Sequence, residues 1–243
     1  MFSFKTRNKG ISYQILITGA NRGLGLALTE KLLAGGHHIH AINRRESGEL
    51  LQLLEKYPEC LHCYHGDVSD ENSIRQTLET MTGQVDSLDT ILNNAAIHLD
   101  QSCLSLEQVD FSVYLPTFQV NAVGPLMVVK YALRLLRKGH KKLIVNISSE
   151  AGSIGACWRK NEYSYCMSKA ALNIASRILQ NAFKEEGIKV LALHPGWFSS
   201  DMGGTDAPTT PSGAAEGIVK LLLNPPGLDG PIFVDSNGEA LEW

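Results

Sequence analysis

The chain has 243 residues, of which 44% are hydrophobic and 19% charged, and its formal net charge is −3. This composition is typical of a chain that folds around a core, and it excludes disorder and collagen-like repeats. The near-neutral charge gives no electrostatic footprint for a nucleic acid or an anionic membrane. We therefore expect a small molecule or a protein as the partner.

The sequence predicts neither a membrane span nor a secretory signal. No stretch approaches the ~18 uncharged apolar residues that a span needs, and the basic N-terminus is not followed by an apolar core. The five cysteines are an odd number, which fits reduced thiols better than a disulfide framework. The expected location is the cytoplasm.

Apolar runs alternate with segments of helical period along the chain. In order, the pattern predicts a strand over 13–18, a helix over 24–33, a strand over 38–42, a helix over 46–57, a strand over 60–64, a helix from about 70 and a strand over 88–93. It continues with a helix over 119–137, a strand over 142–147, a helix over 163–184 and strands over 189–193 and 232–234.

Strands that are apolar on both faces and separated by helices indicate a parallel sheet covered by helices on both sides. Right-handed crossovers then give a doubly wound, Rossmann-like α/β fold of about seven strands. We expect one domain over 1–243, with 1–12 as an N-terminal extension and 199–213 as a loop that closes over the substrate.

The first predicted strand leads into a glycine-rich turn, Thr18-Gly-Ala-Asn-Arg-Gly-Leu-Gly25, and then into a helix. Glycines allow the backbone to approach a pyrophosphate, and the helix N-terminus offers free amides. A P-loop would end in Gly-Lys-Ser or Gly-Lys-Thr, which this turn lacks. The turn predicts a dinucleotide site, with a purely structural turn as the alternative. Its predicted cofactor contacts are Gly19, Asn21, Arg22, Gly23, Leu24 and Gly25.

The end of the second predicted strand bears on which dinucleotide binds. An acidic residue there would bind the ribose diol of NAD, but the sequence reads Asn43-Arg44-Arg45. Arg44, with Arg22, is placed to pair with a 2′-phosphate, which favours NADP(H) and leaves NAD(H) open. The alternative is that these arginines are only solvated. Asp67 follows the third strand, where it is either an adenine contact or an ordinary turn residue before a helix.

Six segments together resemble the short-chain dehydrogenase/reductase superfamily. They are Thr18-Gly-x-x-x-Gly-x-Gly25, Asn93-Asn-Ala-Ala96, Asn121-Ala-x-Gly124, Ile147-Ser-Ser149, Tyr165-x-x-x-Lys169 and His194-Pro-Gly196. They occur in the family's order and span nearly the whole chain. Within the superfamily, the segments 163–169, 194–204 and 238–243 are similar to sniffer-type carbonyl reductases and C-factor-like bacterial proteins.

The resemblance implies a set of catalytic residues. Tyr165 is the implied proton donor or acceptor, Lys169 its activator and ribose anchor, and Ser149 the residue that orients the substrate carbonyl. Asn121 is implied to hold a water in the proton relay. Tyr165 and Lys169 are four apart on a predicted helix, so both project from one face. The ammonium, with an oxidised nicotinamide, is expected to pull the Tyr165 pKa down towards working pH.

The resemblance also implies further cofactor contacts along the carboxyl edge of the sheet. These are Asn43, Val68, Asn93, Ala95, Tyr165, Lys169, Pro195, Gly196, Phe198 and Ser200. Two positions depart from the family's pattern. The interval from Ser149 to Tyr165 is longer than usual, which predicts an enlarged loop on the substrate side around 158–162, and Ala96 replaces a common glycine.

No metal site is expected. Cys60, His62 and Cys63 are interpreted as strand residues, because residues three apart on a strand face opposite sides and no second Cys pair completes four ligands. His194 is interpreted as a packed or hydrogen-bonded residue.

The sequence thus predicts an NADP(H)-dependent oxidoreductase that moves hydride between nicotinamide and a carbonyl or alcohol substrate. The alternative is a C-factor-like protein that binds a dinucleotide for signalling or regulation, with little turnover. The expected partners are a small-molecule substrate and a second copy of the chain, in a dimer through the helices that carry Asn121 and Tyr165, as family members often form. No nucleic acid and no membrane are expected.

Overall fold

The computed structural model describes residues 11–100, 105–200, 202, 204 and 206–243. Its sheet, within these residues, has the strands β1 (Gln14–Thr18), β2 (His38–Asn43), β3 (Leu61–His65), β4 (Thr90–Asn93), β5 (Leu143–Ile147), β6 (Lys189–Leu193) and β7 (Phe233–Val234). Neighbouring strands pair in parallel, in the order β3-β2-β1-β4-β5-β6-β7. The predicted doubly wound, seven-stranded fold is confirmed. Most of the expected N-terminal extension lies outside the described residues.

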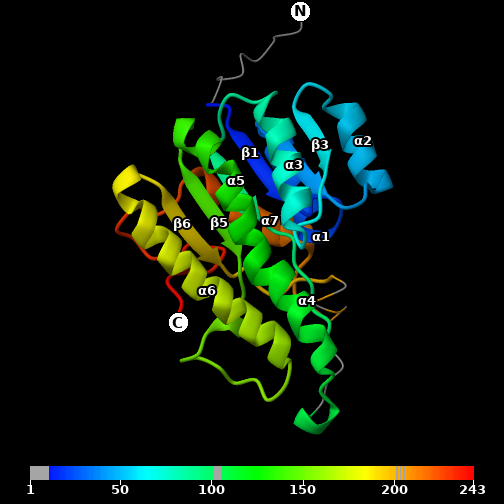
Figure 1. Ribbon diagram of the computed structural model, residues 1–243, viewed down its shortest axis with the longest axis vertical. Helices are drawn as coiled ribbons and strands as arrows, with labels where there is room; N and C mark the ends of the chain where they lie inside the picture. The colour runs from blue at the N-terminus through cyan, green and yellow to red at the C-terminus, as the bar shows by residue number, and fades with distance from the viewer. Residues whose placement is uncertain (1–10, 101–104, 201, 203, 205) are drawn as a thin grey trace, which may run out of the picture.

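Helices cover both faces of the sheet. They are α1 (Gly23–Ala34), α2 (Gly48–Lys56), α3 (Glu71–Thr82), α4 (Tyr114–Phe118), α5 (Gly124–Lys138), α6 (Tyr163–Phe183) and α7 (Pro211–Leu223). In Figure 1, α5 and α6 lie in front of the sheet, with α1 and α7 behind it. Strand side chains alternate between the two resulting cores: Ile15 and Ile17 pack on the side of α1 and α7, and Leu16 on the side of α3 and α5.

The order of the strands reverses between β1 and β4, which opens a crevice at their carboxyl ends. Asn94 fixes the width of this crevice. Its side-chain amide donates to the carbonyl oxygens of Thr18 and Gly19, each at 3.0 Å. The Thr18 hydroxyl in turn accepts from the backbone N–H groups of Asn94 and Ala95, each at 3.1 Å. The loop after β4 is therefore tied directly to the glycine turn after β1.

The helix predicted over 119–137 begins earlier than expected and is interrupted. It starts as α4 at Tyr114, passes through a π-helical turn at Gln119–Val123 and continues as α5. Pro116 does not prevent the early start, because it lies in the first turn, where backbone N–H groups have no helical acceptor. π-turns inside helices are frequent at functional sites, and this one contains Asn121.

The sequence reading overlooked α7, and the expected closing loop extended to residue 213. The helix already begins at Pro211, where proline suits the first helical position, and the Thr210 hydroxyl accepts from the N–H of Gly213. Two glycines lower its intrinsic helix propensity. Burial of Ile218 and Leu222 on the side of α1 supplies the stability that the local sequence lacks.

An 18-residue stretch within Phe111–Lys138 has a mean hydropathy of 1.2, so this segment could cross a membrane by length and composition alone. Half of this 18-residue apolar stretch is buried inside the fold. The buried part includes Val128, Ala132 and Leu136, which pack in the core between α5 and the sheet. Its hydrophobicity is accounted for by this packing, as in other core helices.

Candidate active site

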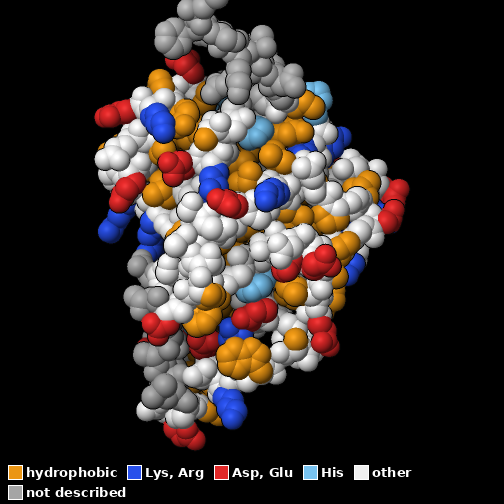
Figure 2. Space-filling view, turned by 180° about the vertical axis from the view of Figure 1, so that it is seen from behind, with side chains coloured by type: hydrophobic (Ala, Val, Ile, Leu, Met, Phe, Trp, Pro, Cys, Tyr) orange, Lys and Arg blue, Asp and Glu red, His pale blue; other side chains and the backbone are white. Residues whose placement is uncertain are grey.

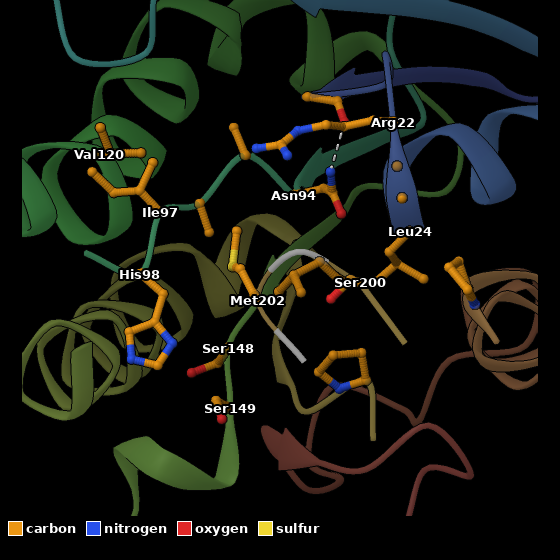
Figure 3. Close-up of a pocket in the computed structure, with 18 of the residues that line it drawn as sticks. Arg22, Leu24, Asn94, Ile97, His98, Val120, Ser148, Ser149, Ser200 and Met202 are labelled. Carbon is orange, nitrogen blue, oxygen red and sulfur yellow. Dashed lines mark hydrogen bonds between the residues drawn. The ribbon is translucent and has the colours of Figure 1, made fainter. Parts of the chain in front are cut away.

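A cleft of about 1450 Å³ opens at the carboxyl edge of the sheet. Figure 3 shows Arg22 and Asn94 at one end of it and His98, Ser148 and Ser149 at the other. The predicted site residues that line the cleft are Gly19, Asn21, Arg22, Gly23, Leu24, Gly25, Asn43, Arg44, Asp67, Val68, Ala95, Ser149, Tyr165, Lys169, Pro195, Gly196, Phe198 and Ser200. Segments from across the chain are thus brought to one cavity.

Two predicted site residues lie behind this lining. Asn93 is 3% exposed, and its amide donates to the Asn146 side chain at 2.8 Å and to the Pro125 carbonyl at 3.4 Å. Asn121 is 1% exposed. Its oxygen accepts from the N–H of Ile97 at 2.8 Å, and its amide donates to the Ile97 carbonyl at 2.8 Å and to the Ser168 hydroxyl at 3.0 Å. Asn121 therefore links the backbone of the loop after β4 to α6 through hydrogen bonds.

The glycine turn forms a cradle that larger residues would fill. Gly19 has a φ of +71°, a conformation that favours glycine. A Cβ at Gly25 would overlap the carbonyl oxygen of Gly19. Asn43 supports the turn by accepting a hydrogen bond from the N–H of Ala20 at 2.6 Å, while its side-chain nitrogen is buried without a hydrogen-bond partner. The shape of the turn therefore depends on glycine at both positions.

The far rim of the cradle carries positive charge. The Arg44 guanidinium lies 3.8 Å from the Asp67 carboxylate, and its side chain is 64% exposed. Asp67 also accepts from the N–H and hydroxyl of Ser69, at 2.8 and 2.7 Å. Arg22 also lines the cleft. A glycine cradle followed by an arginine rim fits a dinucleotide with a phosphate beyond its first ribose.

The opposite end of the cleft gathers a hydroxyl, a phenol and an amine. Ser149 follows β5, and Tyr165 and Lys169 come from the first two turns of α6. The Ser149 hydroxyl favours ionisation of Tyr165 and thus lowers its pKa, and it accepts a hydrogen bond from the N–H of Ala151 at 3.1 Å. The Lys169 nitrogen lies 5.6 Å from the centre of the Tyr165 ring and donates to the carbonyl of Ile147 at 2.8 Å.

Burial dominates the ionisation of this pair. It raises the pKa of Tyr165 to about 12, and the nearby Ser149 hydroxyl opposes the shift only in part. This reverses the expected direction, because the desolvation of the phenolate outweighs the favourable charges that the protein itself supplies. Burial also lowers the pKa of Lys169 to about 8, since the ammonium loses its hydration. Tyr165 is thus a neutral phenol at neutral pH.

Sequence reasoning missed a charged cluster beside Tyr165. The His98 ring stacks on the Tyr165 ring, with centroids 4.1 Å apart and an angle of 21° between the planes. The His98 Nε2 lies 3.4 Å from Asp100 and 3.7 Å from Glu162. In the sequence, only the position of His98 shortly after the Asn-Asn-Ala-Ala segment could have indicated that it belongs to the site. The side chains around it are brought together by the tertiary structure.

The loop before α6, which the sequence predicts to be enlarged, is held in place by Arg159. This guanidinium donates two hydrogen bonds to the Glu150 carboxylate, at 2.5 and 2.9 Å, and a third to Glu162 at 2.8 Å. Trp158, which is 74% exposed, lines the cleft from the same loop. His194 accepts from the N–H of Glu150 at 3.3 Å, as expected of a hydrogen-bonded rather than a free histidine.

The segment after β6 forms the last wall of the cleft. Gly196 has a φ of +82°, Phe198 makes a parallel bridge to Thr209, and Ser200 pairs with Gly204. Residues 201, 203 and 205 of the expected closing loop lie outside the described residues.

A doubly wound sheet with a glycine cradle and a Tyr-Lys-Ser group at its carboxyl edge defines the class. The chain belongs to the short chain dehydrogenase family, whose model matches residues 13–210. The C-signal protein of Myxococcus xanthus is 35% identical over 158 residues, which cover 64% of this chain and 93% of that protein. The family resemblance seen in the sequence is confirmed.

Solved structures show the same similarity over nearly the full length. The carbonyl reductase Sniffer of D. melanogaster has a TM-score of 0.89 at 30% identity, covering 96% of this chain and 100% of that chain. An NADPH-bound carbonyl reductase from chicken fatty liver has a TM-score of 0.85 at 28% identity, covering 96% of this chain and 99% of that one.

Proposed function

We propose that this chain is an NADP(H)-dependent carbonyl reductase that transfers hydride between the nicotinamide and a carbonyl or alcohol substrate. One observation carries the proposal: the Ser149 hydroxyl, the Tyr165 phenol and the Lys169 amine meet in the same cleft as the glycine cradle. The NADPH-bound chicken enzyme, similar over 96% of this chain, supports both the reaction class and the cofactor.

The bound dinucleotide would supply the hydride, and the protein's own groups would manage the carbonyl oxygen. The hydroxyls of Ser149 and Tyr165, which line the same cleft, would hold that oxygen and polarise the carbonyl. Tyr165 would donate its proton as negative charge develops on the oxygen. Lys169, anchored on the Ile147 carbonyl beneath the ring, would stabilise the phenolate that remains.

Reprotonation of Tyr165 requires a path for protons from solvent. Asn121 joins the Ile97 backbone to Ser168 behind the tyrosine, so it is the proposed residue that keeps a water in place along that path. The segment 199–210, which ends where α7 begins, is the proposed loop that closes over the substrate, because its described residues Ser200 and Met202 line the cleft.

The arginine rim supports a preference for NADP(H). Arg44 follows the end of β2, where an NAD-specific enzyme would carry an acid, and Arg22 also lines the cleft. Both guanidinium groups are proposed to bind the 2′-phosphate, and Asp67, held by Ser69, is the proposed adenine contact.

The proposal is tested with purified protein, NADPH and a panel of aldehydes, ketones and quinones, by following NADPH oxidation. We expect turnover of part of the panel and a fall in kcat of roughly 10²-fold or more in Tyr165→Phe, because the general acid is lost while ring packing is kept. NADPH binding, followed by fluorescence, should persist in this variant. Turnover that is unchanged in Tyr165→Phe would contradict the assignment.

A second function is favoured by the 35% identity to the C-signal protein. In that case the chain binds a dinucleotide for signalling or regulation and turns over little substrate. The same assay separates the two: tight NADPH binding without reduction of any member of the panel supports the alternative.

We also propose that the chain works as a homodimer in the cytoplasm. The outer face of α6 exposes Met167, Ile174 and Ile178, which are 51%, 57% and 58% exposed and lie at helical spacing on one stripe. The described cysteines are free thiols, which supports a reducing compartment. On the face shown in Figure 2, acidic and basic side chains are interspersed rather than gathered in one patch of either sign.

A further inference from the structure

His98 occupies the wall of the cleft next to the reacting groups. Its ring stacks on that of Tyr165 at 4.1 Å, and its side chain is 6% exposed. The preceding residue, Ile97, is held on both sides of its peptide by Asn121. The imidazole is therefore held in place by the backbone of the preceding residue and by the Tyr165 ring that stacks on its face. The direction of each ring nitrogen follows from this placement.

One of the two nitrogens points at carboxylates. The Nε2 atom lies 3.4 Å from Asp100 Oδ1 and 3.7 Å from Glu162 Oε1. Each acid is itself anchored: the second oxygen of Asp100 accepts from the N–H of Ser164 at 2.8 Å, and that of Glu162 accepts from Arg159 at 2.8 Å. Nε2 and Asp100 Oδ1 are both buried and neither has a hydrogen-bond partner among the described residues, so their approach at 3.4 Å is an electrostatic contact rather than a formed hydrogen bond.

A carboxylate accepts hydrogen bonds and donates none, so the proton of a neutral His98 belongs on Nε2. Burial keeps the imidazole neutral by lowering its pKa, together with the positive charges of Arg159 and Lys169, and it outweighs the opposing effect of Asp100 and Glu162. The other nitrogen, Nδ1, then carries a lone pair. Figure 3 shows the His98 ring with a nitrogen directed towards the side of the cleft where Ser148 and Ser149 lie.

We propose that His98 determines substrate specificity: its Nδ1 accepts a hydrogen bond from a hydroxyl or N–H group that the substrate carries within a few bonds of its carbonyl. The inference rests on the proposed function, in which Ser149 and Tyr165 hold the carbonyl oxygen. Because His98 is in contact with the Tyr165 ring, a donor that reaches Nδ1 must lie close to the reacting carbon. The substrate class is therefore hydroxy- or amino-substituted carbonyl compounds.

The size of the effect follows from the burial of the acceptor. A substrate without the donor group displaces water from Nδ1 and forms no hydrogen bond to replace the one that is lost. An unsatisfied buried acceptor of this kind lowers kcat/KM by roughly 10- to 100-fold. A substrate with the donor avoids this loss. Discrimination should thus appear between molecules that differ only by exchange of a hydroxyl for a methyl group.

The test uses two such matched pairs with NADPH: 2-hydroxyacetophenone against propiophenone, and 4-hydroxybutan-2-one against pentan-2-one. In the wild-type protein the hydroxylated member of at least one pair should have a kcat/KM about 10-fold higher or more. In His98→Phe, which keeps a ring to stack on Tyr165, that ratio should fall towards one. His140→Phe makes the same chemical change at an exposed position, and it should keep the wild-type ratio.

Asp100→Asn provides a second variant that leaves the histidine in place. The new amide can accept from Ser164 through its oxygen and present its nitrogen to His98, so the proton moves to Nδ1 and the cleft loses its acceptor. A substrate hydroxyl can also accept from an Nδ1–H group, so the tautomer rather than the hydroxyl preference is the readout of this variant. Nitrogen-15 NMR of the His98 ring should report the Nε2–H tautomer in the wild type and a gain of the Nδ1–H tautomer in Asp100→Asn. Thermal unfolding and NADPH binding check that each variant is folded.

The outcomes separate this inference from the function on which it rests. If no carbonyl compound of the panel is reduced, the proposed function fails. If the panel is reduced but neither pair discriminates, if neither pair is turned over, if the ratio survives in His98→Phe, or if the wild type shows the Nδ1–H tautomer, then the assignment of His98 is overturned.

Discussion

Tyr165 and Lys169 show how burial sets the chemistry of single residues. Neither is unusual as a residue type, but burial raises the pKa of one to about 12 and lowers that of the other to about 8. The resemblance to the family's Tyr-x-x-x-Lys motif identified the pair, and the spacing of four residues placed both on one face of a helix. The direction of the tyrosine shift was not predictable from the sequence, since it depends on how completely the fold removes water from the phenol.

These values predict a pH dependence for carbonyl reduction. Lys169 loses its proton as pH rises through about 8, well before Tyr165 does, so the phenolate formed in the reaction loses its stabilising charge. We expect kcat to fall above about pH 8 in the wild type. In Lys169→Arg, which keeps a positive charge, this decline should be absent or displaced to higher pH. The measurement is kcat against pH at saturating NADPH and substrate, and an identical decline in both proteins would contradict it.

Arg44 gives a prediction about cofactor choice. In Arg44→Asp a carboxylate replaces the guanidinium beside Asp67 and repels a 2′-phosphate, so the ratio of kcat/KM for NADPH over NADH should fall by about 10-fold or more. Arg75→Asp, on the outer surface of α3, is the matched control and should leave the ratio unchanged. An unaltered preference in Arg44→Asp would remove this residue from the cofactor site.

At the scale of elements, the strands were predictable and two helices were not. Predicted and observed strands agree within two residues at each end, because buried parallel strands are continuous apolar runs. Both helical segments depend on tertiary contacts. The π-turn at Gln119–Val123 depends on the hydrogen bonds between the Asn121 side chain and the Ile97 backbone, and the helix Pro211–Leu223 depends on packing against α1. The same reason hid His98, whose partners come from separate loops.

The approach of α1 to the glycine turn is tested at Gly25. A side chain there would overlap the Gly19 carbonyl and crowd Asn94, so Gly25→Ala should destabilise the fold by roughly 1–3 kcal/mol and abolish tight NADPH binding. Gly48→Ala, at the start of α2 with no atom within 4 Å of the new Cβ, is the control and should be neutral or slightly stabilising. Thermal unfolding with and without NADPH measures both effects, and equal behaviour of the two variants would refute the close approach.

At the scale of the molecule, the topology gathers distant segments at one edge. Parallel strands end on the same side, so the loops after β1, β4, β5 and β6 all contribute to the cleft. The outer faces of the helices do not line the cleft, so they are available for contacts with other molecules. The apolar stripe of Met167, Ile174 and Ile178 lies on the outer side of the same helix that carries Tyr165.

This stripe predicts self-association. Light scattering after size-exclusion chromatography should give twice the mass of one chain for the wild type. Ile174→Glu combined with Ile178→Glu should give monomers, because charge is introduced into the proposed apolar contact. Leu51→Glu, at an exposed position on α2, should remain dimeric. A monomeric wild type, or a dimer that tolerates both glutamates, would locate the contact elsewhere or exclude it.

The central claim is that the cleft delivers hydride from a nicotinamide to a carbonyl carbon while Tyr165 supplies the proton. The most direct measurement is mass spectrometry of the alcohol formed from a reduced ketone with NADPH deuterated at both C4 positions. The account predicts one deuterium on the former carbonyl carbon in the wild type and no more than a trace of labelled alcohol in Tyr165→Phe. An unlabelled alcohol, or equal labelled product from both proteins, would contradict it.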